Sequence, residues 1–296
     1  PLYVFRAVNG IPVEFAFDPA TVTTIELAPG RATRANADGR TIQSGITPGT
    51  GIALTAHPRQ GSAVRIVVLS ESQAEQLWVM PLQGRARLLF SEALLYSDDG
   101  ALELRSMGNP HFRVGVFPAL AGSPSANPIV RRQATDGIFQ VFSADAPVRS
   151  INATLTRLRE AQTVPPIAIG GPAQAALQPY PEVFGKSAAW SIAVPADAVS
   201  DSDDAYLQLD YVGDVARLFS GTELIDDGYF NGLTWEIGLK RFASKLRQPL
   251  TLTILPLRQD APIYLEPQYQ PALAVGTQQA DIVRARVVPE YRLRIE

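Results

Sequence analysis

Apolar and polar side chains alternate most clearly in residues 206–242. Leu207, Leu209 and Tyr211 fall on one face of an expected strand, and the residues between them fall on the other face. Glycine-containing pairs interrupt this stretch and predict tight turns, because glycine adopts a positive φ without strain. These pairs are Gly213-Asp214, Ser220-Gly221, Asp227-Gly228 and Asn231-Gly232. Short strands between glycine-rich turns are typical of an antiparallel β-sandwich.

The same pattern predicts strands along the rest of the chain. They are Leu2–Val8, Val13–Phe17, Val22–Leu27, Ile52–Ala56, Ala63–Leu69, Arg85–Phe90, Ala101–Arg105, Phe112–Phe117, Ile138–Phe142, Ile151–Glu160, Ala188–Val194, Leu250–Leu257 and Ile282–Ile295. The composition of Ile151–Glu160 would also allow a helix. Asp38-Gly39 and Asp99-Gly100 mark further turns. One short helix is expected over Glu71–Trp78, because Ser70 and Gln73 form a capping-box pattern.

Length and composition favour two domains. The chain has 296 residues, including 24 proline and 22 glycine residues, which suits many short strands joined by turns. Residues 119–137 are small, polar and proline-rich, so we expect a linker there. The sequence therefore predicts an all-β protein of two tandem antiparallel sandwich or jelly-roll domains, residues 1–118 and 138–296, with one short helix in the first.

Charge and residue usage narrow the functional classes. The net charge of −3 gives no electrostatic reason to expect nucleic acid or an anionic membrane as a partner. The chain has no cysteine, which excludes disulfides and thiolate metal sites. No run of 18 or more apolar residues predicts a membrane span. The chain begins at Pro1 and runs directly into strand-like sequence, so we expect a piece of a longer protein. No cofactor is expected.

Two long blocks carry a family resemblance. YVGDVARLF, ELIDDGYFNG and WEIGLKRF, which lie within residues 206–242, resemble the C-terminal jelly-roll region of bacterial family 35 glycoside hydrolases, the β-galactosidases. The block Ile66–Ser106 resembles the β-rich accessory domain of the same enzymes. The resemblance implies a galactose-binding-like second domain, a catalytic barrel as partner, and a periplasmic or extracellular location. The family's (β/α)8 barrel has no counterpart in this sequence, so the activity does not carry over.

One group of residues combines the chemistry that sugar recognition needs. A sugar offers an apolar C–H face to a flat ring and hydroxyl groups to carboxylate or amide side chains. Both kinds of group occur within a few positions, and the candidate contact residues for carbohydrate or for the barrel are Asp226, Asp227, Tyr229, Asn231 and Trp235. The alternative is that Trp235 is a core residue, since large aromatic side chains usually pack inside.

Other motifs give less support for a site. Asp201, Asp203 and Asp204 could bind Ca²⁺, although a solvated acidic loop is the simpler interpretation. His57 and His111 are read as ordinary turn histidines, and no metal site is assigned. Gly185-Lys186-Ser187 lacks the preceding glycine of a phosphate-binding loop.

The resemblance thus implies a non-catalytic accessory region that packs on a catalytic barrel, and we expect it to contact a galactoside or oligosaccharide. A stand-alone carbohydrate-binding module and a purely structural sandwich are the alternatives. No catalytic residue is assigned.

Overall fold

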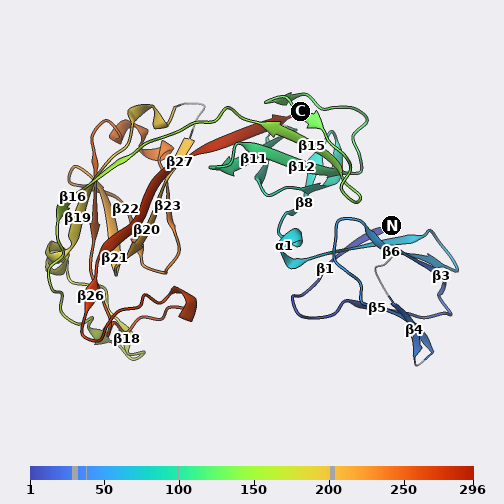
Figure 1. Ribbon diagram of the computed structural model, residues 1–296, viewed down its shortest axis with the longest axis horizontal. Helices are drawn as coiled ribbons and strands as arrows, with labels where there is room; N and C mark the ends of the chain where they lie inside the picture. The colour runs from blue at the N-terminus through green and yellow to red at the C-terminus, as the bar shows by residue number, and fades with distance from the viewer. Residues whose placement is uncertain (29–32, 38, 99, 201–203) are drawn as a thin grey trace. The chain divides into compact units, whose positions relative to one another are not determined.

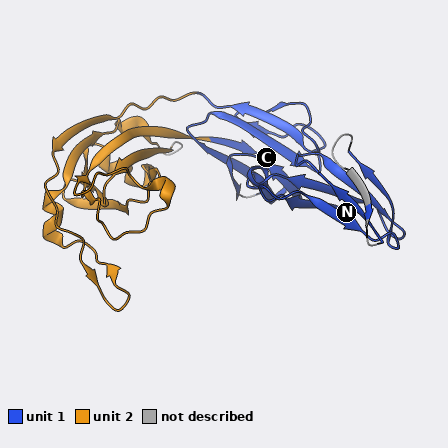
Figure 2. Ribbon diagram, turned by 60° about the horizontal axis from the view of Figure 1, so that its bottom comes forward, with its two compact units in different colours: residues 1–147, 292–296 blue, residues 148–291 orange. Residues whose placement is uncertain are grey.

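The computed structural model describes residues 1–28, 33–37, 39–98, 100–200 and 204–296. Strands dominate, which confirms the all-β prediction (Figure 1). The chain divides into two units, coloured separately in Figure 2. Unit 1 contains residues 1–147 and 292–296, and unit 2 contains residues 148–291. None of the described helices is long and apolar enough to cross a membrane.

The described part of unit 1 forms several sheets. Three of them have the strand orders β1-β7-β6-β3, β2-β5-β4 and β14-β15-β12-β9-β8, and β10 pairs with β11. The strands are β1 (Leu2–Arg6), β2 (Glu14–Phe17), β3 (Val22–Leu27), β4 (Thr33–Ala37), β5 (Arg40–Ser44), β6 (Ile52–Pro58), β7 (Val64–Leu69), β8 (Leu77–Leu82), β9 (Arg85–Phe90), β10 (Leu94–Asp98), β11 (Ala101–Met107), β12 (His111–Phe117), β13 (Ala126–Asn127), β14 (Arg131–Arg132) and β15 (Gln140–Asp145).

Unit 1 departs from the expected antiparallel arrangement at its first strand, because β1 runs parallel to β7. A parallel pair needs a long crossover connection, and residues 7–63 provide one. The buried side chains of unit 1 form separate clusters, one around Leu54 and Ile66 and another around Phe90 and Phe139. The rings of Phe90 and Phe139 stack with their centroids 5.3 Å apart.

The predicted helix is present but shorter than expected. Helix α1 spans Glu71–Ala74, and both hydrogen bonds of the Ser70–Gln73 capping box form. Leu77 and Trp78 belong instead to β8, where they pair with β9. The capping residues fixed the helix start, but the apolar residues that follow gain more from sheet pairing than from another helical turn.

Unit 2 is a β-sandwich. One sheet has the order β16-β19-β24-β21-β22, and the other contains β27-β20-β23. The elements are β16 (Thr154–Arg159), β17 (Ile169–Gly170), β18 (Ala175–Ala176), η1 (Pro181–Lys186), β19 (Ala188–Ala193), η2 (Ala196–Ala198), β20 (Asp204–Val212), β21 (Val215–Ser220), β22 (Glu223–Tyr229), β23 (Trp235–Gly238), η3 (Lys240–Lys245), β24 (Leu250–Ile254), β25 (Leu257–Arg258), η4 (Pro267–Tyr269), β26 (Gln278–Gln279) and β27 (Asp281–Ile295).

The core of unit 2 lies between these two sheets. Trp190 and Leu218 reach it from the first sheet, and Leu207, Leu209 and Ile237 reach it from the second. Leu207 and Leu209 are fully buried, as their alternation predicts. The strand expected at residues 151–160 is β16, whose residues are all exposed. Long strand β27 begins in unit 2 and ends in unit 1, where Ile295 pairs with Ala126 of β13.

The structure divides the chain elsewhere than expected. Residues 119–137 were predicted to be a linker, but they contribute β13 and β14 to sheets, and β15 pairs with β12 of unit 1. Near the end of this segment, Asp136 accepts hydrogen bonds from the Thr50 hydroxyl and from Arg113 Nη2, the latter at 2.6 Å. Polar composition therefore did not mark a boundary here, because the polar groups bind other parts of unit 1.

Several predicted turns fall differently in the structure. Asp227 and Gly228 lie inside β22 and form no turn, and Gly228 has no positive φ of the kind that a tight turn would use. At Asn231-Gly232 the turn is present, and Gly232 has a φ of +79°. Asp38, Asp99, Asp201 and Asp203 lie outside the described residues, so the hairpin tips and the acidic loop predicted there receive no structural account.

Candidate functional site

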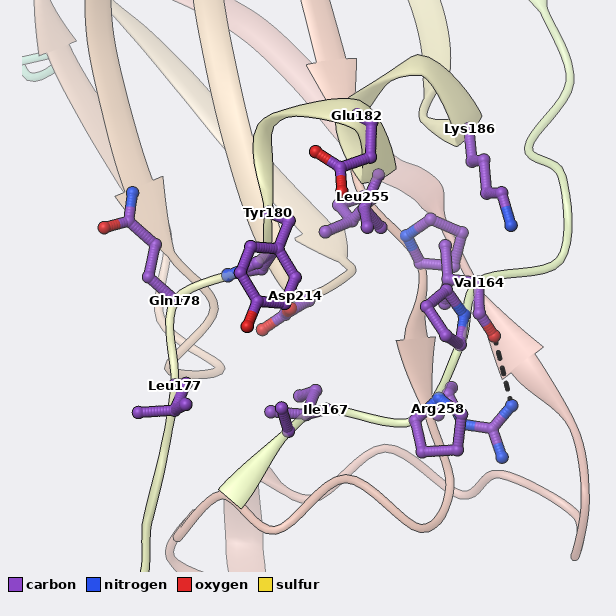
Figure 3. A pocket seen from close by; sticks show the side chains of 16 residues that line it. Val164, Ile167, Leu177, Gln178, Tyr180, Glu182, Lys186, Asp214, Leu255 and Arg258 are labelled. Carbon is purple, nitrogen blue, oxygen red and sulfur yellow. Dashed lines mark hydrogen bonds between the residues drawn. The ribbon is translucent and has the colours of Figure 1, made fainter. Parts of the chain in front are cut away.

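A cavity of about 460 Å³ opens beside the first sheet of unit 2 (Figure 3). Apolar side chains supply most of its wall, among them Val164, Ile167, Leu177 and Leu255. The polar side chains that line it are Gln178, Tyr180, Glu182, Lys186, Asp214 and Arg258. We call this cavity the Asp214 pocket. Its volume falls within the range of small-molecule sites.

The segment 164–186 builds one side of the Asp214 pocket. Prolines at 165, 166, 179 and 181 fix φ and remove backbone donors, which keeps most of this segment out of sheets. It turns back on itself through the short β17–β18 hairpin. Val164, Val183 and Phe184 then pack against Val215 and Leu255. This apolar contact holds the segment against the sheet.

The backbone fixes Asp214 on both sides. It lies in the turn between β20 and β21, its N–H donates to Leu255 O at 2.7 Å, and its carbonyl accepts from Phe230 N at 2.9 Å. The preceding Gly213 is required here, since a Cβ at that position would overlap the side chain of Ile254. The carboxyl group is therefore held at one place in the pocket wall, where Figure 3 shows it among the lining side chains.

Asp214 is a buried acid without a side-chain partner. The residue is only 7% exposed, and within the described part of the chain no group donates a hydrogen bond to its carboxyl oxygens. Burial raises the pKa of the Asp214 carboxyl to about 6, because the charged form loses its hydration. Burial first, and the Asp214 charge second, also raise the pKa of the Tyr211 hydroxyl. At neutral pH the pocket therefore contains an uncompensated negative charge.

The pocket's arginine is already paired. Arg258 donates from Nε and Nη2 to the two carboxyl oxygens of Asp260, both at 2.7 Å, and from Nη1 to Val164 O at 3.2 Å. The hydrogen bond from Arg258 lowers the pKa of Asp260. Arg258 thus anchors the start of the 164–186 segment, as the dashed line in Figure 3 shows. The phenol of Tyr180 is 61% exposed at the pocket mouth.

The five residues expected to form one contact surface take different places. Asp227 and Tyr229 share the outward face of β22, opposite Arg217 and Val215 of β21. Tyr229 is 63% exposed. Asp226 lies in β22 between Asp227 and the bulge, and its carboxylate is paired with Arg241. The structure therefore brings Asp227 and Tyr229 together and uses Asp226 for an ion pair.

Asn231 and Trp235 have local structural roles. Asn231 Oδ1 accepts a hydrogen bond from Leu233 N at 2.9 Å, which closes the turn before β23. Trp235 is half-buried; its ring lies 6.2 Å from that of Tyr211, centroid to centroid, and packs over Gly228. Trp235 therefore packs at the edge of the core. This matches the alternative interpretation of Trp235 as a core residue.

The candidate metal ligands that the structure describes do not form a cluster. Within the described ranges, no group of three or more histidine or acidic side chains could hold an ion. Both histidines lie in strands and not in turns, and each contacts a carboxylate: His57 Nε2 lies 3.1 Å from Glu26, and His111 Nδ1 lies 2.7 Å from Asp145. Asp204 Oδ1 accepts from the backbone N–H groups of Ala205 and Lys240.

Comparison with known proteins adds no assignment. No protein-family model matches the chain, and no curated protein matches it.

Sequence reasoning missed the Asp214 pocket. Asp214 was read only as part of a turn, and Lys186 only as part of a failed phosphate-binding motif. The available signal was an acid enclosed by apolar residues in YVGDVARLF, together with a proline-rich segment long enough to cover a sheet face. Neither signal says that the two segments meet, because residues 164–186 and residue 214 come together only through tertiary packing.

Proposed function

We propose that this chain is a non-catalytic accessory region of a β-galactosidase-like glycoside hydrolase, and that unit 2 contacts carbohydrate through the outward face of β22. Two long sequence blocks support the assignment by their resemblance to family 35 enzymes. In this proposal the partner is a catalytic barrel, on the same precursor or on a separate chain. The bound carbohydrate is a galactoside or an oligosaccharide.

The exposure of Tyr229 beside Asp227 is the observation that carries the carbohydrate contact. A Tyr ring that is 63% exposed on a strand offers the flat apolar surface on which a sugar's C–H face packs. Asp227 is also exposed, and its position two residues before Tyr229 places its carboxylate on the same face. If Asp227 and Tyr229 only stabilised the fold, neither side chain would need to face water.

A sugar titration tests this proposal. Galactose, lactose and a β-1,4-galactan oligosaccharide would be added to the purified chain while backbone NMR signals or binding heats are followed. We expect saturable binding to at least one of them, and Tyr229→Ala or Asp227→Asn should weaken it by about tenfold or more. Tyr264→Ala is the matched control, because Tyr264 is 87% exposed in unit 2 but lies outside β22.

The outcomes separate the candidate functions. Sugar binding that depends on Tyr229 supports the carbohydrate contact, either in an accessory region or in a stand-alone carbohydrate-binding module. A purified family 35 barrel that forms a complex with this chain supports the accessory role. Absence of sugar binding together with absence of barrel binding would leave a purely structural sandwich and contradict the proposal.

A further inference from the structure

We infer that the Asp214 pocket binds a small organic cation, an ammonium group carried on a compact apolar body. This inference does not depend on the carbohydrate proposal, because it concerns different residues of unit 2 and a different ligand chemistry. Three properties of the pocket support it: its preformed apolar walls, its buried carboxylate without a side-chain partner, and an aromatic ring at its mouth.

The walls favour an apolar ligand body. Ile167, Leu177 and Leu255 line the pocket, and they present no hydrogen-bonding side-chain groups. The prolines of the 164–186 segment and its packing through Val164 onto Val215 hold this wall in place without a ligand. A ligand therefore need not order the wall when it binds, which favours affinity. Any sugar hydroxyl group that faced Ile167, Leu177 or Leu255 would lose its hydrogen bonds to water without gaining a partner.

The charge balance favours a cation. Arg258 is neutralised by Asp260, which leaves Asp214, Glu182 and Lys186 as the remaining charged groups among the described lining residues and gives them one net negative charge. Asp214 is the buried one of these three. A buried carboxylate without a partner is costly, and a bound ammonium group would supply both the opposite charge and the missing hydrogen-bond donors. An anionic ligand would meet repulsion at the same point.

The ring at the mouth completes the arrangement. Tyr180 lines the pocket and is largely exposed, so its face remains open to a ligand. An aromatic face attracts a nearby cation through its quadrupole. The ligand that fits has its ammonium group at Asp214 and its apolar body along Ile167 and Leu177, the side chains that flank this space in Figure 3.

Three ligands of nearly equal shape test the assignment. Benzylammonium, benzyl alcohol and benzoate would each be titrated into the full chain at neutral pH, with NMR signals of the 164–186 segment and Asp214 as the readout. We expect saturable binding of benzylammonium at least about tenfold tighter than that of benzyl alcohol, and no binding of benzoate. Equal affinity for benzylammonium and benzyl alcohol would overturn the inference.

Two variants locate the binding. Asp214→Asn keeps the shape of the side chain and removes its charge, so the preference for benzylammonium over benzyl alcohol should disappear. Asp197→Asn, a change at an exposed aspartate of unit 2 outside the pocket, should preserve that preference. Ala168→Trp should block both ligands, because Ala168 lines the pocket and is itself exposed, so the larger side chain can be accommodated without disturbing the core.

The remaining outcomes decide against the site. Unchanged benzylammonium binding in Asp214→Asn, or in a folded Ala168→Trp variant, would place the cation elsewhere. Failure of all three ligands to bind saturably would also reject the inference. Sugar binding at Tyr229 is measured separately, so either proposal can fail while the other holds.

Discussion

Gly137 packs directly against the backbone of Thr50, at a point where a Cβ atom would overlap the Thr50 carbonyl group. Gly137 has a φ of +56°, and the next residue, Ile138, donates its N–H to Thr50 O at 3.0 Å. The residue before the glycine, Asp136, accepts a hydrogen bond from the Thr50 hydroxyl. Residues far apart in the chain are thus joined by a close backbone contact that only glycine permits.

Replacing this glycine should destabilise unit 1. Gly137→Ala adds a methyl group where backbone atoms already stand, and it forces a non-glycine residue to a positive φ. We expect a loss of at least about 2 kcal/mol in the free energy of unfolding, measured with denaturant. Gly122→Ala is the control, because no atom lies within 4 Å of the added Cβ and φ is not positive there. Equal stabilities for the two variants would contradict this contact.

The same contact explains why the domain boundary was not predictable. Composition alone favoured a linker over residues 119–137, since small, polar and proline-rich sequence usually crosses no core. The polar side chain of Asp136 instead accepts hydrogen bonds from Thr50 and Arg113, which lowers the pKa of its carboxyl. A sequence does not reveal such distant partners. The start of α1 was predictable because the capping box is local, with its two residues three positions apart.

The candidate site was predictable only in part. The sequence grouped Asp227 with Tyr229 as candidate contact residues, but it predicted a turn at Asp227-Gly228, where the structure has strand β22. Glycine in a strand can mark a turn or a close approach of another group, and local sequence does not separate the two. Here Gly228 lies within the strand beside the Trp235 ring, at a distance that would leave an ordinary contact for a Cβ, so neither role of glycine applies.

Trp235 should contribute to stability, while Tyr229 should not. Trp235 is half-buried against the core and contacts Tyr211, so Trp235→Ala should cost about 2–3 kcal/mol of unfolding free energy, less than a fully buried Trp. Tyr229→Ala should change it by less than about 0.5 kcal/mol, because the ring is mostly in water. Denaturant unfolding of unit 2 measures both. A cost for Tyr229→Ala as large as that for Trp235→Ala would show that Tyr229 supports the fold.

The purified chain should not hydrolyse aryl β-galactosides. A retaining glycosidase needs two carboxyl groups about 5 Å apart, one as acid and one as nucleophile. Of the acids discussed above, Asp226 is paired with Arg241, and Asp214 is buried in an apolar wall. A chromogenic galactoside assay at high protein concentration is the measurement. Turnover that is lost in Asp214→Asn or Glu182→Gln would contradict the non-catalytic assignment.

Because of Asp214, the free energy of unfolding should decrease as pH rises from acidic values toward neutrality. Its pKa is raised from 3.8 to about 6 on folding, so the folded state holds the proton more tightly than the unfolded chain does. Stability contributed by the protonated form is therefore lost as pH rises from about 4 to about 6, by about 2 kcal/mol in total. Asp136 and Asp210 act oppositely, because their pKa values are lowered and their contribution is lost only on further acidification.

Asp214→Asn should remove this dependence. The variant carries no charge at this position, so its unfolding free energy should be nearly constant between about pH 4 and pH 6 and should exceed that of the unchanged protein at pH 7. Asp197→Asn changes an exposed acid and should retain the wild-type slope. Urea unfolding followed by the fluorescence of buried Trp190 reports on unit 2 across this range. A wild-type slope that persists in Asp214→Asn would mean that another group titrates, and that the Asp214 carboxylate is compensated in solution.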